Sequence, residues 1–343
     1  MVFFRGVRLA LLLTALLVLS QRCLAETVDL CDQYSSYNST TVPFFFNNNA
    51  WGNDSSGYQC LDVNDGGTSF TVTYKWTGTP TLVKSYPYMK PFPSRLPVQL
   101  WNVSQLNFAA DWSITVNSAG DTSEPAQAAA YDAAGLRANV AVDMFLSDNA
   151  LNSTGFRPPL EIMIWTWWIP VMKPLGWDES TPDIDRVVID GVAFSLYHGY
   201  NDRNQHVFSW LSERNLTSTN ADYSPLLKYI WQKGLLSGAL YLGQLEFGTE
   251  IAYASEETVF EAKNYTLQLV RQGDPEDRAA SSSAAAAAAT STTTSSSLRE
   301  TTPTSTSAKP ASSSSVAQHL CERHLLWLFV WINSMPICLH SLT

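Results

Sequence analysis

A glutamate set among tryptophans is the feature of this sequence with the clearest chemical potential. Glu161 begins the run Glu-Ile-Met-Ile-Trp-Thr-Trp-Trp, which is rich in isoleucine and tryptophan and has prolines on both sides, and this predicts a strand. Alternation puts Glu161, Met163, Trp165 and Trp167 on one face and the isoleucines on the other. A charge among large apolar side chains is unfavourable without a purpose, and flat indole rings suit the apolar faces of sugars. The alternative is an exposed glutamate at the strand edge with no role.

A second candidate acid lies in a later predicted strand, in the run Gly-Gln-Leu-Glu-Phe-Gly-Thr-Glu that ends at Glu250. Alternation gives Glu246, Gly248 and Glu250 one face, and a glycine between two acids leaves room for a ligand near the backbone. If Glu161 and Glu250 lie on neighbouring strands of a concave sheet, their carboxylates can be about 5 Å apart. That separation suits a retaining glycosidase, in which one carboxylate attacks the anomeric carbon and the other protonates the leaving oxygen.

The elements that must position these acids are predicted to be strands. Apolar residues alternate with polar ones in several runs separated by turn-forming residues, and many short strands of this kind indicate a sandwich, jelly roll or barrel. The predicted strands lie at 70–76, 112–116, 140–144, 187–189, 192–197, 206–211, 240–247 and 265–270. One helix is predicted, with Ser224 as N-cap, Pro225 at the first helical position and Gly234 at its end, and we expect it to pack outside one sheet.

The two ends of the chain differ in composition from its middle. Residues 1–25 combine arginines, an apolar run and a small-residue cleavage site, which is typical of a secretory signal peptide. Residues 26–272 have the composition of one folded domain, whereas residues 273–318 are mostly Ala, Ser, Thr and Pro and predict a disordered, O-glycosylated stalk. Residues 319–343 contain an apolar tail with features of a glycolipid (GPI) anchor signal, a route to membrane attachment. The alternatives are a nonfunctional extension and a wrongly predicted terminus.

Secretion determines how the cysteines and asparagines are interpreted. Cys31 and Cys60 are the only cysteines of the predicted domain, and in an oxidising compartment we expect them to form a disulfide. The domain has no CxxC motif or Cys/His cluster, so no metal site is expected. Asn-x-Ser/Thr sequons mark candidate glycosylation sites, of which we expect some to be used. They begin at Asn38, Asn53, Asn102, Asn152, Asn215 and Asn264.

Net charge and missing motifs exclude several function classes. The formal net charge of -10 argues against a nucleic-acid partner, because phosphate binding needs a basic surface. The sequence has no HExxH, GxSxG, Walker or GxGxxG motif, so the corresponding metalloprotease, hydrolase and nucleotide-binding chemistries are set aside. The composition fits a soluble secreted protein that acts on a neutral or cationic partner.

Nine short motifs occur in the order found in glycoside hydrolase family 12, which the chain resembles over nearly all of residues 29–270. The motifs begin at Cys31 (CDQY), Asn48 (NNAWG), Lys84 (KSY), Asp111 (DWS), Asp143 (DMF), Glu161 (EIMIW), Pro174 (PLG), Gly199 (GYN) and Phe247 (FGTE). The resemblance implies an all-β jelly-roll sandwich of two stacked antiparallel sheets, with an open groove across the concave sheet. It also implies the same disulfide between Cys31 and Cys60.

Carried over by position, the resemblance implies three catalytic residues. Glu161 matches the family's nucleophile and must stay ionised, which requires hydrogen bonds that favour the charge. Glu250 matches the general acid/base and must be protonated, which burial and negative neighbours favour. Asp143 matches the acid that holds the nucleophile and adjusts its pKa; the alternative is a structural cap. Glu246 stands where glutamine is expected, and if it faces the groove its charge would raise the pKa of Glu250.

The resemblance also implies how a sugar chain would be held. Trp51 matches a sugar-stacking residue on the non-reducing side, with Asn49 near it, and its alternative is a core residue. Trp165 and Asn201 match other groove positions, while Met163 is either a substrate contact or a packing residue of the groove floor. The chain departs from the family pattern after Trp165 and after Glu250, and this puts the substrate preference in doubt.

The function expected from this resemblance is that of a secreted endo-β-1,4-glucanase. It would cleave xyloglucan, or unbranched or mixed-linkage β-glucan, by a retaining double displacement without metal or cofactor, and it would act as a monomer. One alternative is a carbohydrate-binding protein on the same sandwich without turnover. Another is a surface protein that a host or partner recognises, with the stalk and anchor as its main features.

Overall fold

The computed structural model describes residues 27–93, 95–178 and 185–283. The predicted signal peptide, residues 284–318 of the predicted stalk and the apolar tail lie outside the described residues. Within the described ranges, no helix is both long and apolar enough to cross a membrane. The same ranges hold no group of three or more His, Cys, Asp or Glu side chains that could bind a metal ion.

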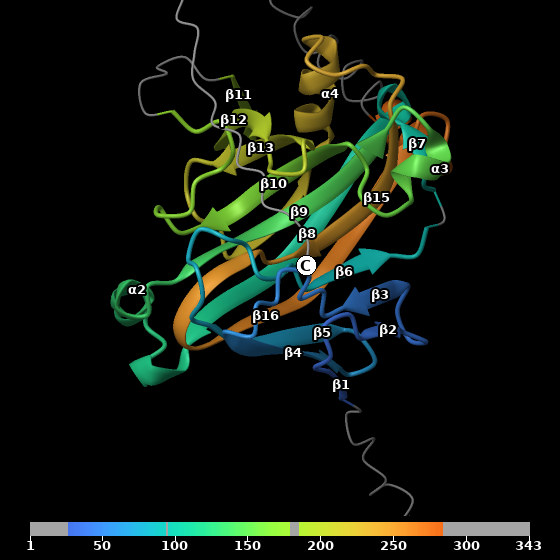
Figure 1. Ribbon diagram of the computed structural model, residues 1–343. Coiled ribbons are helices and arrows are strands. Elements are labelled where there is room, and N and C mark those ends of the chain that lie inside the picture. The colour runs from blue at the N-terminus through green and yellow to red at the C-terminus, as the bar shows by residue number, and fades with distance from the viewer. Residues whose placement is uncertain (1–26, 94, 179–184, 284–343) are drawn as a thin grey trace, which may run out of the picture. The chain divides into compact units, whose positions relative to one another are not determined.

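Two β-sheets face each other across a shared apolar core (Figure 1). In hydrogen-bonded order, the first sheet consists of β1 (Val28–Leu30), β4 (Gly57–Asn64), β5 (Ser69–Trp76), β16 (Ile251–Arg271), β8 (Val103–Val116) and β14 (Ser218–Asp222). The second sheet consists of β2 (Ser36–Asn38), β3 (Phe44–Asn47), β6 (Tyr88–Pro91), β15 (Tyr241–Gly248), β9 (Arg137–Ser147), β10 (Leu160–Trp168), β13 (His206–Ser212), β12 (Val192–Tyr200) and β11 (Arg186–Ile189). A short strand, β7 (Val98–Gln99), pairs with the beginning of β15. The predicted sandwich of stacked sheets is confirmed.

Two features of the strand pairing go beyond the prediction. Among the described strands every pairing is antiparallel except that of β10 with β13, which run parallel. This pair arises because the chain reaches β13 through β11 and β12 instead of through a hairpin. In addition, β16 joins the two sheets: Ile251 and Tyr253 pair with β9 of the second sheet, and the strand from Ala254 onward pairs with the first.

The core between the sheets follows the alternation seen in the sequence. In β5, Phe70, Val72, Tyr74 and Trp76 are buried, and the residues between them are partly exposed. The ring of Phe70 contacts aromatic rings from other strands at centroid distances of 5.6 to 6.5 Å, among them Phe247 of β15. Because one face of β15 contributes to this core, its opposite face points away from the first sheet. We call this side of the second sheet its free face.

Helices are more numerous than predicted. The predicted helix is α4 (Ser224–Gln232), which begins one residue earlier than expected because Tyr223 is the N-cap. Its apolar side chains belong to the main core, and it packs against β8 of the first sheet and β11 of the second. The helices that were not predicted are α2 (Glu124–Ala133), α3 (Ala150–Ser153) and the 3-10 helices η1 (Leu100–Asn102) and η2 (Asn117–Ala119). They lack an apolar stripe; in α2 the buried residue is Gln127.

Order continues past the predicted end of the domain. Residues 275–283, assigned to the stalk from composition, are helical. Arg95 fixes the beginning of this segment, because its guanidinium lies 2.6 Å from Glu276 and 3.6 Å from Asp274. Composition did not predict this helix, because composition does not show the ion pairs that its first residues form with Arg95.

The expected disulfide is present, and the sequons are accessible. Cys31 and Cys60 are bonded and tie the segment after β1 to β4. The sequon asparagines are exposed except for Asn102, which is half-buried. Glycosylation at these positions stays a prediction.

Candidate active site

Three adjacent strands of the second sheet carry acids on its free face. Glu161 lies on β10, Asp143 on β9 and Glu246 on β15, and Asp143 is directly opposite both Glu246 and Met163. Glu250 follows β15, in the connection to β16. The sequence suggested that Glu161 and Glu250 lie on neighbouring strands, but β10 and β15 are not neighbours. β9 lies between them and places Asp143 in the middle of the acids.

A bulge in β10 changes which tryptophans share a face with Glu161. The pairing of β10 with β9 shifts between Trp165 and Trp167, and this extra residue inverts the alternation. Trp167 enters the main core, where its ring meets Tyr131 edge-on at 5.7 Å. The prediction that Trp167 faces the acids is wrong. Trp168 lies on the free face instead, packed against the cluster that contains Met163 and Trp165.

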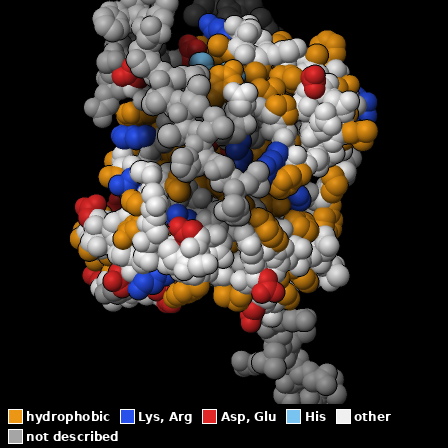
Figure 2. All heavy atoms as spheres, viewed as in Figure 1, with side chains coloured by type: hydrophobic (Ala, Val, Ile, Leu, Met, Phe, Trp, Pro, Cys, Tyr) orange, Lys and Arg blue, Asp and Glu red, His pale blue; other side chains and the backbone are white. Residues whose placement is uncertain are grey.

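The acids on the strands are buried, and their charges interact. Glu161 is 9% exposed, Asp143 4% and Glu246 3%. Burial raises the pKa of each, to about 7 for Glu246, because a charged carboxylate loses its hydration. Figure 2 shows basic and hydrophobic side chains mixed near the middle of the face seen in Figure 1. Four acids so close together cannot all be ionised near neutral pH, so the group retains protons.

Asp143 is the acid best suited to retain a proton. Its pKa is raised well above the ordinary range by burial and by the charges of Glu161, Glu246 and Glu250. Its Oδ1 atom is buried without a hydrogen-bond partner, which is unfavourable for an ionised carboxylate. Asp143 also hydrogen-bonds to Glu161, and this bond lowers the pKa of Glu161. This bond favours the ionised form of Glu161, whereas burial and the charge of Glu250 raise the pKa of Glu161 to about 8.

Glu250 is held in place by Asn139 of β9. The Asn139 side-chain amide donates to Oε2 of Glu250 at 2.6 Å, and the backbone N–H of Glu250 donates to Oδ1 of Asn139 at 3.1 Å. Burial raises the pKa of Glu250 to about 7, and the hydrogen bond from Asn139 opposes the rise. The charge of Glu250 in turn raises the pKa of Glu161, so the two carboxylates lie within electrostatic range.

Sequence reasoning missed the partners of Glu246. Lys90 Nζ lies 3.5 Å from Oε1 of Glu246 and 5.4 Å from the ring centroid of Tyr88, which also hydrogen-bonds to Glu246. Glu246 raises the pKa of Asp143 and Glu161, whereas burial is what raises the pKa of Glu250. The expected effect of Glu246 therefore falls on other acids. Alternation along β6, which gives Tyr88 and Lys90 one face, was the signal available.

The residues expected to line a groove divide into two groups. Met163 and Trp165 are buried in the floor of the free face, where the Trp165 indole N–H donates to the Met163 sulfur at 3.3 Å. Trp51 is 37% exposed and presents its ring to solvent and to Arg203. Trp51 is therefore not a core residue.

The two asparagines of the expected groove organise loops. Asn49 donates its side-chain amide to the Tyr86 carbonyl at 2.9 Å. Asn201 binds within the β12–β13 hairpin, where its Oδ1 accepts from the backbone N–H groups of Arg203 and Gln205 at 3.0 and 3.1 Å. Both side-chain amide nitrogens thus donate to the protein itself.

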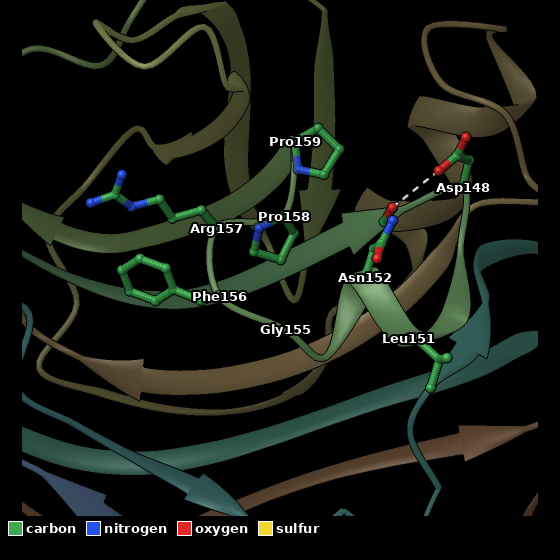
Figure 3. Close-up of a pocket in the computed structure, with 9 residues that line it drawn as sticks. Asp148, Leu151, Asn152, Gly155, Phe156, Arg157, Pro158 and Pro159 are labelled. Atoms are coloured by element: carbon green, nitrogen blue, oxygen red, sulfur yellow. Dashed lines mark hydrogen bonds between the residues drawn. The ribbon is translucent and has the colours of Figure 1, made fainter.

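A pocket of about 310 Å³ lies between the end of β9, α3 and the loop that leads to β10 (Figure 3). Its lining residues are Ser147, Asp148, Leu151, Asn152, Gly155, Phe156, Arg157, Pro158 and Pro159. None of the four acids lines it. In Figure 3, Phe156 and Arg157 extend away from Asp148, and their side chains stack at 4.7 Å. The pocket is therefore a feature separate from the acids.

Comparison with known protein families identifies the family of this chain. The sequence model of the family described as Glycosyl hydrolase family 12 matches residues 42–270. The chain belongs to this family. The match spans the strands that carry Glu161, Asp143 and Glu246, and it also includes Glu250.

Relatives of this family 12 protein cover most of its length. It is 29% identical to "Xyloglucan-specific endo-beta-1,4-glucanase A" of Emericella nidulans, over 70% of this chain and 91% of the relative. It is 29% identical to the protein of the same name from Aspergillus aculeatus, over 71% of this chain and 92% of the relative. Endoglucanase 3 of Trichoderma harzianum has a similar structure, with a TM-score of 0.58 at 24% identity, over 73% of this chain and all of that one. The fold of this family 12 hydrolase is thereby that of known members.

Proposed function

We propose that this glycoside hydrolase is a secreted endo-β-1,4-glucanase that cleaves internal bonds of xyloglucan, or of cellulose-type or mixed-linkage β-glucan. The observation that carries the proposal is the arrangement of Glu161, Asp143 and Glu250 on one free face. Burial raises the pKa of each acid, and the hydrogen bonds of Asp143 to Glu161 and of Asn139 to Glu250 oppose this rise. The names of the fungal relatives favour xyloglucan as the substrate. Trp51 and the aromatic floor around Trp165 provide surfaces on which sugar rings can stack.

The chemistry follows from two carboxylates with different roles. An Oε atom of ionised Glu161 attacks the anomeric carbon, the glycosidic bond breaks, and the proton of Glu250 passes to the leaving oxygen. A water molecule then gives its proton to Glu250 and attacks the same carbon, and the bond to Glu161 breaks. The anomeric configuration is retained after two inversions. Asp143 acts on this sequence through its hydrogen bond to Glu161, which lowers the pKa of Glu161 and favours its ionised form.

The experiment that tests this proposal compares the secreted full-length protein with its E161Q variant. The substrates are tamarind xyloglucan, carboxymethylcellulose and barley β-glucan. We expect release of reducing ends by the wild type and a loss of at least about 10³-fold in E161Q. Cleavage of xyloglucan alone would assign a xyloglucanase, and cleavage mainly of unbranched glucans would assign a cellulase-type endoglucanase. A folded wild-type protein that binds glucan but releases no ends would instead support the non-catalytic binding protein.

We infer the export and attachment of the protein from segments outside the described residues. Residues 1–25 would direct secretion, residues 26–272 with the helix that follows would form a monomeric catalytic unit, and residues 319–343 would supply a lipid anchor. N-terminal sequencing of the mature protein should begin at Glu26. Release from cells by a phospholipase that cleaves glycolipid anchors would support the anchor, and protein found wholly in the medium would contradict it.

A further inference from the structure

The β12–β13 hairpin holds Arg203 in a defined place. The Oδ1 atom of Asn201 accepts from the backbone N–H groups of Arg203 and Gln205, and the Asn201 amide donates to the Gln205 side chain at 2.8 Å. Gln205 in turn donates to the Pro158 carbonyl at 3.0 Å, which fixes the hairpin to the segment just before β10. The backbone of Arg203 is therefore anchored next to the strand of Glu161.

The loop that carries Trp51 is equally constrained. The N–H of Gly52 donates to the Lys84 carbonyl at 2.8 Å, and a Cβ atom at Gly52 would lie 2.2 Å from the Val83 carbonyl oxygen. Lys84 is buried and forms an ion pair with Asp54 at 2.8 Å. The backbone on both sides of Trp51 is thus closely packed, and its ring is left exposed.

Arg203 and Trp51 meet although their strands are far apart in the sheet. Four strands, β6, β15, β9 and β10, lie between β3, which precedes Trp51, and β13, which follows Arg203. In a flat sheet the two strands would be about 24 Å apart. The guanidinium carbon of Arg203 nevertheless lies 4.7 Å from the centroid of the Trp51 ring. The two loops therefore approach each other across the strands that carry the acids.

We propose that Arg203 is a specificity-determining residue that covers the sugar-stacking face of Trp51, and that a glucan chain must displace it to use this face. The inference rests on the proposed function and identifies which residue limits binding at its Trp51 position. Arg203 and a sugar ring compete because both bind to the flat face of the indole. Displacement is feasible because the Arg203 side chain is exposed and only its backbone is held by hydrogen bonds.

The size of the effect follows from the contact that is lost. A cation over an exposed aromatic ring contributes about a two- to fivefold factor to an equilibrium constant. Removing the cation while leaving the ring should strengthen glucan binding by that factor. Arg203 also lowers the pKa of Glu161 through its charge, so its removal should move the acidic limb of the activity profile to higher pH.

The test is a double-mutant cycle in the full-length protein on the glucan that the wild type cleaves best. R203Q, W51A, the double variant W51A/R203Q and R203K would be compared by KM, kcat and the pH profile of kcat/KM. R278Q is a matched control, because Arg278 is exposed on the helix at 275–283. We expect R203Q to lower KM two- to fivefold with kcat nearly unchanged and to raise the pH of the acidic limb. R203K should resemble the wild type, and R203Q should have no effect on KM once Trp51 is removed.

Several results would overturn the inference. An unchanged or raised KM in R203Q, or an equal decrease of KM in the W51A background, would show that Arg203 does not cover Trp51. A wild-type protein that cleaves no β-glucan would overturn the proposed function and this inference together. Normal wild-type cleavage with an unaffected R203Q variant would overturn the inference alone.

Discussion

Asn139 forms three hydrogen bonds with Glu250. Its side-chain amide donates to Oε2, its Oδ1 accepts from the Glu250 backbone N–H, and its own backbone N–H donates to the Glu250 carbonyl at 3.1 Å. Two of these bonds set the position of the backbone, and one acts directly on the carboxylate. β9 therefore both positions Glu250, the proposed general acid/base, and adjusts its affinity for a proton.

The N139A variant should shift the alkaline limb of activity. Glu250 must be protonated to act as the acid, so kcat/KM should fall as the pH rises through its pKa of about 7. The bond from Asn139 stabilises the ionised form, so its loss should raise this limb by roughly one pH unit. A pH profile of kcat/KM on a soluble glucan measures the shift. N220A, which changes an exposed residue of β14, is the control; a limb that moves down would contradict the assignment.

The E250Q variant should separate the two steps of the reaction. Loss of the general acid should slow cleavage of a glucan by about 10²–10⁴-fold, because the leaving oxygen needs the proton. An aryl cellobioside with an acidic phenol leaving group needs no such proton, so E250Q should release a burst of phenol followed by slow turnover. Stopped-flow absorbance measures the burst, and E161Q should give none. Equal losses on both substrates would argue against Glu250 as the acid.

The E246Q variant should be more stable than the wild type at alkaline pH. The pKa of Glu246 rises from 4.5 to about 7 on folding, so its contribution to stability is full below pH 4.5 and is lost as the pH rises through 7. The difference corresponds to about 3 kcal/mol. Thermal unfolding should give a higher Tm for E246Q at pH 8 and a similar Tm at pH 4. E261Q, at a partly exposed position of β16, is the control, and an equal shift at both pH values would contradict this explanation.

The C31S/C60S double variant should unfold at a lower temperature than the wild type, although Glu161 and Glu250 are unchanged. The bond closes a loop with a sequence separation of 29 residues, which corresponds to about 3–4 kcal/mol of stabilisation. Calorimetry of the double variant and of reduced wild type should give the same lower Tm. A Tm equal to that of the oxidised wild type would show that the neighbouring β4–β5 pairing is sufficient by itself.

The fold could be predicted where one face of a strand is buried. β5 shows the clean alternation of such a strand and was predicted at 70–76, whereas of β8 only the end, at 112–116, was predicted. In β10 the alternation is broken by the bulge after Trp165, which leaves no local mark because Thr166 and both flanking tryptophans are all strand-forming residues. The position of Trp167 therefore depended on pairing with β9, which is a long-range property. The parallel pairing of β10 with β13 is equally non-local.

The candidate site could be predicted in its residues but only partly in its contacts. Glu161 and Glu250 stood out by their neighbours in the sequence, whereas Lys90 and Asn139 did not, because their roles depend on which strands become adjacent. Arg203 was invisible for the same reason. Its partner Trp51 comes from a loop about 150 residues away in the chain, and the contact depends on how the two loops are placed by the fold.

The passage of β16 from one sheet to the other has a consequence for heat inactivation. Glu250 directly precedes β16, which pairs with β9 of the second sheet through Ile251 and Tyr253 and continues into the first sheet from Ala254. Local unfolding around Glu250 would have to disrupt the strand that joins the two sheets. This region should therefore not unfold at a lower temperature than the rest of the sandwich. Catalytic failure and collapse of the sandwich should thus be a single cooperative event, and the enzyme should remain fully competent until just before it unfolds.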